Sequence, residues 1–238
     1  MSLAPPEGNG PLLRERLRTA RLYLCCEARP RGEDPEALLR AALTGGVDIV
    51  QLREKELGRL DIERAADVYR RVADTFSALF IVNDDPDLAR ACDADGVHVG
   101  KHAEVEAARE LLGPDAIVGL STHSEAEVEA AAELPVDYIA VGPVWETPTK
   151  PGRPGIGLQP ISYAAERSAH PFFAIGGIDP GNAERVVRAG AGRLCVVRAI
   201  RDAADPAAAA EALRQAFAAG GEEPLDATAP RRGVAPGG

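Results

Sequence analysis

Lysine is rare in this chain, and each lysine follows an apolar, strand-like run. Of the 27 lysines and arginines, only Lys55, Lys101 and Lys150 are lysines. The lysine ammonium group is a compact point charge suited to phosphate oxygens, whereas arginine presents a planar fork. In a chain of net charge −10, three such charges at strand ends predict a local anion-binding site. The alternative is that all three are solvated surface residues.

Polar residues also follow the second and third strand-like runs. Gln51 and Arg53 alternate with Leu52, so both point to one side of a strand, inward, while Leu52 points outward. If these strands form a barrel, burying an amide and a guanidinium in its mouth costs free energy. The cost is offset only if they meet a polar ligand, each other or a carboxylate in an internal salt bridge. Asn83 and Asp84 follow the next run, where an amide suits a phosphate oxygen and a carboxylate suits Mg²⁺.

Two further runs carry imidazole and hydroxyl groups. His98 lies in the alternating segment GVHVG at 96–100 and is predicted to face the barrel interior, as a catalytic group or as a hydrogen-bonded core residue. The fifth run ends in Ser121, Thr122 and His123. His123 or the following Ser124 could simply lead into the next helix.

The longest loop follows the sixth run, over residues 142–155. At about 14 residues it exceeds the usual strand-to-helix connection, which suggests a lid or a binding loop. Its hydroxyls at Thr147 and Thr149, together with Lys150, make a plausible anion clamp.

Glycines and an arginine end the last two runs. Gly176 and Gly177 follow the seventh, and Val197 and Arg198 the eighth. These are the positions of the phosphate site that is frequent in barrel enzymes. Two anion subsites are therefore predicted on one face, one formed by Arg53, Lys55, Asn83 and Lys150, the other by Gly177, Arg198 and the hydroxyls of Thr147 and Thr149.

These candidates require a scaffold that brings strand ends together. Apolar runs predict strands at 22–26, 49–53, 79–82, 96–99, 117–120, 138–141, 172–175 and 194–197. Helical spacing of apolar residues predicts helices at 35–44, 60–76, 86–92, 104–112, 124–133, 182–189 and 205–219. Eight strand–helix units in about 200 residues indicate an α/β (β/α)8 TIM barrel, with its active site at the carboxyl ends of the strands. A doubly wound open sheet is the alternative, although its glycine-rich fingerprint is missing after the first run.

Composition and charge limit the class of protein. With 45% hydrophobic residues, we expect one globular barrel domain over 20–220, an N-terminal extension at 1–19 with a short helix at 12–19, and a disordered tail at 221–238. The acidic balance argues against nucleic acid and anionic membranes as partners. No secretory signal or spanning run is evident, so a cytoplasmic location is expected. A homo-oligomer is compatible with the sequence. The four cysteines are expected to be buried free thiols.

Taken together, the segments resemble the thiamine phosphate synthase family. The resemblance covers about residues 20–218 and rests on QLREK at 51–55, NDD at 83–85, GVHVG at 96–100, GLSTH at 119–123, GPVWETPTKPGRPG at 142–155, FAIGGI at 173–178 and VVRAI at 196–200. It implies a barrel enzyme that joins a hydroxymethylpyrimidine diphosphate to a thiazole phosphate, releases pyrophosphate and uses Mg²⁺. In that family pyrophosphate leaves first, and the thiazole nitrogen captures the pyrimidine cation.

The resemblance also implies roles for individual residues. Those that would hold the diphosphate are Arg53, Lys55, Asn83 and Lys150. Gln51 and His98 would lie near the pyrimidine, Asp84 would bind Mg²⁺, and Ser121 would lie between the two substrates. Those that would receive the thiazole phosphate are Thr147, Thr149, Gly176, Gly177, Val197 and Arg198.

The chain departs from the family pattern just after GVHVG. The family usually has Gln, any residue and Asp there, and that aspartate is a second metal ligand. This chain has Lys101, His102 and Ala103, and alanine cannot coordinate a metal. Our hypothesis is that Lys101 supplies the charge of the missing carboxylate–metal pair, so that Mg²⁺ dependence is weakened. Alternatively, Glu104 or Asp85 completes the metal shell.

Two other functions stay open at this point. One is that of the related thiazole tautomerase, which isomerises a thiazole carboxylate phosphate by proton transfer, with His123 as acid and base. The retained diphosphate residues argue against it, because a substrate with one phosphate needs no diphosphate clamp. The other is an inactive paralogue that binds thiamine phosphate, for which Ala103 is the only support.

Overall fold

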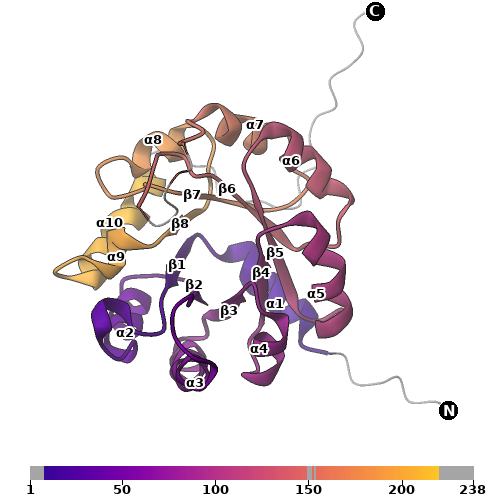
Figure 1. Cartoon of the computed structure of the whole chain (residues 1–238). Coiled ribbons are helices and arrows are strands. Elements are labelled where there is room, and N and C mark those ends of the chain that lie inside the picture. Colours follow the sequence, from indigo (N-terminus) through magenta and orange to yellow (C-terminus); the bar gives the residue numbers. More distant parts are fainter. Residues whose placement is uncertain (1–7, 149–151, 153, 220–238) are drawn as a thin grey trace, which may run out of the picture.

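A closed barrel of eight parallel strands forms the centre of the molecule (Figure 1). The computed structural model describes residues 8–148, 152 and 154–219. Its strands are β1 (Leu22–Cys26), β2 (Ile49–Leu52), β3 (Leu79–Asn83), β4 (Gly96–Val99), β5 (Ile117–Thr122), β6 (Tyr138–Val141), β7 (Phe172–Ile175) and β8 (Leu194–Val196). Because β8 pairs with β1, the predicted barrel is confirmed and the open sheet is wrong.

Helices surround the barrel and alternate with its strands (Figure 1). They are α1 (Gly10–Thr19), α2 (Glu36–Thr44), α3 (Arg59–Phe76), α4 (Pro86–Ala91), α5 (Val105–Leu112), α6 (Glu125–Ala130), α7 (Gln159–Arg167), α8 (Ala183–Arg188), α9 (Arg198–Arg201) and α10 (Pro206–Ala219), with single 3-10 turns at Pro30–Gly32, His102–Glu104 and Ala131–Glu133. No helix in these described ranges is long and apolar enough to cross a membrane.

Two helices were not predicted from the sequence. Helix α7 buries only Ile161 and Ala164, which is too few apolar residues for a clear helical period. The single turn of α9 begins at Arg198, where β8 has already ended. The strand predicted at 194–197 is therefore one residue too long.

Side chains alternate between two cores along each strand. Inside the barrel lie Tyr23, Ile49 and Phe173, among others. Outward-facing residues such as Leu24 and Val50 pack with the helices in a second, larger core. Strands buried on both faces explain why the runs are almost continuously apolar, and each fully buried large apolar side chain contributes roughly 1.5–3 kcal/mol.

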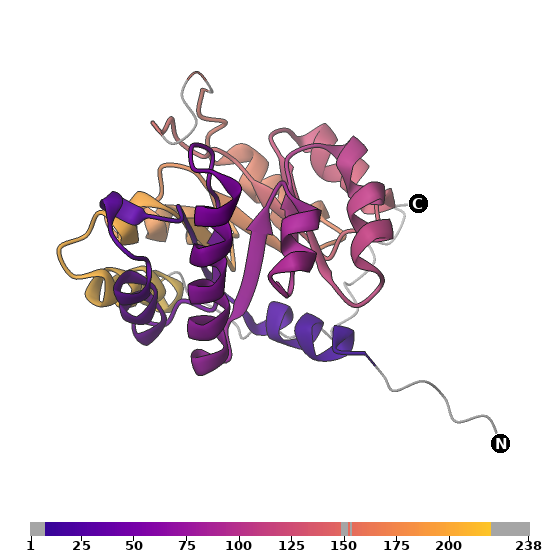
Figure 2. The same cartoon turned by 60° about the horizontal axis from the view of Figure 1, so that its bottom comes forward.

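The amino-terminal end of the barrel is sealed by α1, which crosses beneath the strands (Figure 2). Its residues Leu13 and Leu17 belong to the interior core, in one cluster with Leu79 of β3 and Ile117 of β5. The helix predicted at 12–19 is confirmed and starts two residues earlier, at Gly10. A closed floor leaves the opposite end of the barrel as the open mouth.

Aspartates bind the even-numbered strands to their neighbours at this same floor. Asp48, Asp95 and Asp137 each stand directly before β2, β4 or β6. Each carboxylate accepts a backbone N–H from the preceding strand, at 2.9 Å from Leu22, 2.7 Å from Phe80 and 2.8 Å from Val118. Each also pairs with at least one arginine, and Asp137 pairs with both Arg14 at 2.8 Å and Arg109 at 2.7 Å.

Candidate active site

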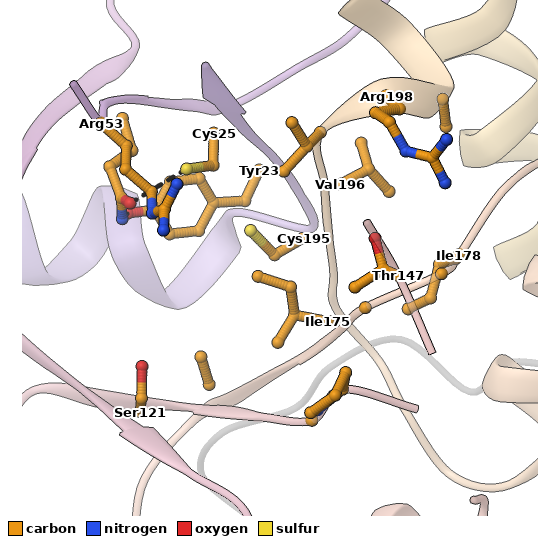
Figure 3. A pocket seen from close by; sticks show the side chains of 18 of the residues that line it. Tyr23, Cys25, Arg53, Ser121, Thr147, Ile175, Ile178, Cys195, Val196 and Arg198 are labelled. Carbon is orange, nitrogen blue, oxygen red and sulfur yellow. Dashed lines mark hydrogen bonds between the residues drawn. The ribbon is translucent and has the colours of Figure 1, made fainter. Parts of the chain in front are cut away.

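A pocket of about 330 Å³ opens at the carboxyl ends of the strands (Figure 3). Most of the residues singled out in the sequence line it, although they come from separate strands and loops. These are Gln51, Arg53, Asn83, His98, Ser121, Thr147, Gly176, Gly177, Val197 and Arg198. The fold therefore brings together segments as far apart in the chain as β2 and α9.

The remaining predicted residues do not line this pocket or cannot be placed. Lys55 is exposed on the loop after β2, and Asp84 is exposed on the loop after β3. Thr149 and Lys150 lie outside the described residues. The roles assigned to these four residues stay predictions.

Arg53 stands apart from Arg198 in the pocket, and the two follow β2 and β8, the strands on either side of β1 (Figure 3). The Arg53 backbone N–H donates to the carbonyl of Cys26 at 2.8 Å, which ties the end of β2 to β1. The nearby carboxylate of Glu54 is engaged elsewhere, because it accepts the backbone N–H groups of Ala28, Lys55 and Glu56. Partial burial raises the pKa of Glu54, but these hydrogen bonds outweigh burial and lower it.

No carboxylate forms an ion pair with Arg53 within the described ranges. The internal salt bridge considered for this side chain is therefore not found there. Gln51, its inward-facing neighbour, is satisfied by neutral groups instead: its amide donates to the Tyr23 hydroxyl at 2.6 Å and accepts from the Cys25 thiol at 3.1 Å. Arg53 thus keeps its charge available to the pocket.

Backbone conformation shapes another part of the pocket. Gly176 and Gly177 both have left-handed φ angles, of 102° and 69°. A Cβ atom at Gly176 would lie 2.4 Å from Pro143, and one at Gly177 would lie 2.8 Å from the Cβ of Trp145. Glycine is required for conformation and for space, so that the loop after β6 can approach and place Thr147 in the same pocket as Arg198 (Figure 3).

A row of hydrogen-bonded polar side chains lies at the bottom of the pocket. The Tyr23 hydroxyl lies 3.0 Å from the Tyr138 hydroxyl, which lies 3.0 Å from His98 Nδ1. His98 Nε2 lies 3.0 Å from the hydroxyl of Ser121. All of these side chains are buried. His98 is therefore a hydrogen-bonded interior residue that also lines the pocket, and its part in the reaction stays a prediction.

Tyr23, Cys25 and Tyr138 were missed as site residues in the sequence. Each lies on the inward-facing register of its strand, two residues from another interior position, and that alternation was the available signal. They were overlooked because tyrosine and cysteine in an apolar run look like ordinary core residues. Cys25 is a free thiol, as are Cys26, Cys92 and Cys195, and all but the half-buried Cys92 are buried.

The carboxylates near the mouth offer one candidate magnesium ligand. Asp84 adopts a left-handed φ of 60° and its backbone N–H donates to the carbonyl of His98 at 2.8 Å. Asp85 is engaged in capping α4, where it accepts from Leu88 N at 2.7 Å, and in pairing with Arg59 at 3.0 Å. Within the part of the chain that the structure describes, no three metal-ligating side chains cluster together.

The segment after β4 shows what surrounds Ala103. The Lys101 ammonium lies 3.4 Å from the Glu104 carboxylate, and the Lys101 side chain is 80% exposed. Glu104 also accepts the backbone N–H of Lys101 at 3.2 Å. Both alternative ligands, Asp85 and Glu104, therefore already have cationic partners. Mg²⁺ commonly uses one or two carboxylates together with substrate phosphates, so its binding by Asp84 stays a prediction.

Comparison with known proteins decides the family. A model of the family described as thiamine monophosphate synthase matches residues 22–200. The chain belongs to this family. The thiamine-phosphate synthase of Thermobifida fusca is 49% identical over 211 residues, which cover 87% of this chain and 96% of the relative. That of Streptomyces avermitilis is 50% identical over 201 residues, covering 83% and 94%.

Solved structures agree with this membership of the thiamine monophosphate synthase family. The thiamine phosphate pyrophosphorylase of Pyrococcus furiosus superposes with a TM-score of 0.78 at 31% identity, covering 87% of this chain and all of the other. A 3-hexulose-6-phosphate synthase, at 22% identity and a TM-score of 0.60, shares the fold. The family resemblance expected from QLREK, GVHVG and the other segments is confirmed.

Proposed function

We infer that this chain is a thiamine phosphate synthase, a transferase that joins a pyrimidine diphosphate to a thiazole phosphate and releases pyrophosphate. The observation that carries this function is the placement of Arg53 and Arg198 apart from each other in one pocket (Figure 3). Neither guanidinium forms an ion pair with a carboxylate of the described residues. Two separated cations suit two substrates that each carry an anion at one end and react between them.

The proposed reaction begins by breaking the bond between the pyrimidine methylene carbon and the diphosphate oxygen. The electron pair leaves with the diphosphate, and the positive methylene carbon is stabilised by the aminopyrimidine ring. The thiazole nitrogen then donates its lone pair and forms the new C–N bond. The chain needs no strong base or nucleophile for these steps, because catalysis is achieved by aligning two reactants and stabilising a departing anion.

Residues on the Arg53 side are proposed to hold the diphosphate. Arg53 and Asn83 line the pocket there, and the predicted roles of Lys55 and Lys150 would add charge from the surrounding loops. Gln51 and His98 are proposed to lie beneath the pyrimidine, and Ser121, which also lines the pocket, is proposed to lie between the two substrates. Loss of a preorganised group facing the developing charge typically lowers kcat by about 10²–10³-fold.

The Arg198 side is proposed to receive the thiazole phosphate. Thr147, Gly176, Gly177 and Val197 line this part of the pocket together with Arg198, and Thr149 would extend it. Backbone amides at consecutive left-handed glycines and a hydroxyl suit phosphate oxygens. With the phosphate held here, the thiazole ring would reach back toward Ser121 and the pyrimidine.

Mg²⁺ is proposed to be held by Asp84 and by the diphosphate itself. When bound, it would neutralise part of the charge of the leaving group. Because Ala103 replaces the second carboxylate, we propose that the metal contributes less here than in relatives with both ligands, and that Lys101 supplies part of the missing charge. The salt bridge between Lys101 and Glu104 would have to open for this.

We propose that the enzyme is cytoplasmic and acts on small-molecule substrates. The net charge of −10 supports the absence of nucleic acid and anionic membranes among its partners. A measurement of mass in solution tests whether the chain forms a homo-oligomer.

The experiment that tests this function supplies both substrates, with and without Mg²⁺, and measures thiamine phosphate and pyrophosphate. Formation of both products in equal amounts is expected. Isomerisation of a thiazole carboxylate phosphate without pyrophosphate would instead identify a tautomerase, for which His123 lines the same pocket and donates its Nδ1 hydrogen to the carbonyl of Gly142. Binding of thiamine phosphate without turnover would identify an inactive paralogue.

A further inference from the structure

The hydrogen bonds in the row of polar side chains at the bottom of the pocket all run in one direction, from donor to acceptor. Gln51 Nε2 is an amide donor, and it donates to the Tyr23 hydroxyl at 2.6 Å. The Tyr23 hydroxyl hydrogen then has the Tyr138 oxygen, at 3.0 Å, as its acceptor. Burial is the main reason why the pKa of both phenols is raised well above its ordinary value. Each phenol therefore keeps one hydrogen to donate at neutral pH.

The same logic continues through the histidine. If Tyr138 accepts from Tyr23, its own hydrogen is directed to His98 Nδ1, 3.0 Å away. An imidazole that accepts at Nδ1 and is neutral carries its hydrogen on Nε2. That hydrogen is donated to the hydroxyl oxygen of Ser121, again at 3.0 Å. Ser121 is then left with its own hydrogen to donate to an acceptor atom in the pocket, which it lines.

A missing side chain makes this connection possible. In the strand register Gly119 of β5 lies between His98 of β4 and Tyr138 of β6. A Cβ atom at Gly119 would lie 2.1 Å from the Cζ atom of Tyr138 and 2.5 Å from its hydroxyl. The Tyr138 ring thus occupies the space of the absent Gly119 side chain and reaches across β5 to His98.

Tyr138 acts from below the site. It is fully buried and is not among the residues that line the pocket. Its ring is held edge-on by Tyr23 and Phe173, with centroids 6.0 and 5.5 Å away, and stacks on the His98 ring at 5.5 Å. A ring fixed from three sides holds its hydroxyl in one place.

We propose that Tyr138 is a positioning residue that fixes His98 in its Nε2–H tautomer and thereby makes the Ser121 hydroxyl a hydrogen-bond donor to the substrate. The kinetic part of this proposal rests on the proposed synthase function. The tautomer itself does not, since it is a property of the free protein. Gly119 and Ser121, two residues apart on β5, serve the same network. Gly119 leaves space for the Tyr138 ring, and Ser121 is the last member of the row of hydrogen bonds.

The test replaces Tyr138 with phenylalanine and compares it with a matched control. Tyr138→Phe keeps the ring and removes one buried hydroxyl. Tyr69→Phe makes the same change in a tyrosine that is also fully buried but lies in the outer core, with its hydroxyl bonded to the carbonyl of Glu27 at 3.0 Å. Because Tyr138 acts through another group, its loss should lower kcat less than loss of a direct donor would, about tenfold, with KM values nearly unchanged. Tyr69→Phe should stay within about twofold.

Two further measurements separate a positioning role from a general structural one. Nitrogen-15 NMR of the free protein should show His98 protonated at Nε2 and not at Nδ1, and Tyr138→Phe should remove that preference while Tyr69→Phe should not. The four histidines are distinguished by a His98→Gln sample. The double variant Ser121→Ala/Tyr138→Phe should be no slower than Ser121→Ala alone, because both changes remove the same donor.

The outcomes have distinct meanings. An Nδ1–H tautomer in the wild-type protein overturns the proposal, as does a Tyr138→Phe enzyme with unchanged kcat or effects of Ser121→Ala and Tyr138→Phe that multiply. If the protein shows the predicted tautomer but forms no thiamine phosphate, the synthase function fails and the orientation of the network stands.

Discussion

The arginines that line the pocket have different surroundings from those at the amino-terminal floor of the barrel. At the floor the guanidinium groups pair with the aspartates that precede the even-numbered strands, as Arg70 does with Asp95 at 3.1 Å. At the mouth, Arg53 and Arg198 form no such pair among the residues the structure describes. The same side chain therefore stabilises the fold where its charge is neutralised and is available to anions where it is not.

The aspartates explain why the floor arginines are committed to structure. Each carboxylate also accepts a strand N–H, so removing it would leave a backbone donor without its acceptor and take an ion pair from a guanidinium. The mouth has the reverse arrangement, since Glu54, the carboxylate nearest Arg53 in the chain, is occupied by backbone N–H groups. This matches the usual division of barrels into a stabilising face and a catalytic face.

The largest effect is expected at the mouth. Arg53→Met keeps most of the side-chain volume and removes the charge, so kcat/KM should fall by about 10²–10³-fold while the midpoint of thermal unfolding stays nearly unchanged. Steady-state rates of pyrophosphate release and a thermal melt measure the two quantities. Arg64→Met, at an exposed ion pair with Asp61, is the control and should change neither. An equal loss in both variants would break the comparison.

At the floor the reverse is expected. Asp95→Ala removes the acceptor of the Phe80 N–H and one of the two carboxylates that pair with Arg70, the other being Asp74. The loss should lower the free energy of unfolding by roughly 2 kcal/mol, mainly because the Phe80 N–H is left without an acceptor. Activity per folded molecule should stay within about twofold. Denaturant titration and an assay at low temperature give both values. Asp61→Ala, at the exposed pair with Arg64, should lie within about 0.5 kcal/mol of wild type. A floor variant that is stable but inactive would contradict this division.

A smaller effect concerns the metal at the mouth. Ala103→Asp restores a carboxylate where the family usually has one, and it should lower the Mg²⁺ concentration for half-maximal turnover by about tenfold. The wild-type chain should retain more activity in chelator than this variant does. Ala107→Asp, also exposed and on α5, adds the same charge nearby and should leave the Mg²⁺ dependence unchanged. Identical titration curves for all three proteins would refute the compensating role of Lys101.

The smallest effect tests a floor arginine, Arg193, for which no carboxylate partner is found among the described residues. Arg193 precedes β8 as the aspartates precede β2, β4 and β6, and its guanidinium donates to the carbonyl of Arg18 at 2.9 Å. Its Nε has no partner among the described residues. Burial, with the nearby charges of Arg21 and Arg18, lowers the pKa of Arg193 to about 10. A cation whose pKa is lowered in the folded protein opposes folding at every pH below that value.

Arg193→Met should therefore leave the free energy of unfolding within about 1 kcal/mol of wild type at neutral pH, or raise it. Denaturant titration at neutral pH is the measurement. A loss of unfolding free energy as large as that of Asp95→Ala would mean that Arg193 stabilises the floor without a carboxylate partner. Pairing with a carboxylate would then not be what distinguishes the floor from the mouth.

The strands could be predicted from the sequence because both faces of each are buried. Apolar runs such as 22–26 and 138–141 were located with their observed bounds, and eight of them define a barrel. Helix α7 was missed because its buried surface is small. The pocket lining was predicted well wherever a polar side chain interrupts an apolar run, as at Gln51, His98 and Ser121.

Other parts of the site could not be predicted from one strand at a time. That Gly119 makes room for the ring of Tyr138 depends on the register of β4, β5 and β6, which appears only when the strands are paired. The exposed position of Lys55, outside the pocket lining, depends on the path of a loop. The lysines at strand ends indicated an anion site, but the cationic side chains found in the pocket lining are those of Arg53 and Arg198.

The most direct test measures inorganic pyrophosphate binding by calorimetry in the wild-type protein, in Arg53→Met and in Arg109→Met, whose arginine pairs with Asp137 at the floor at 2.7 Å. The account predicts that the wild type binds pyrophosphate, that Arg53→Met binds it at least about tenfold more weakly, and that folded Arg109→Met binds it as the wild type does. Equal affinity of Arg53→Met and wild type would contradict the claim that the unpaired arginine at the mouth receives the leaving group.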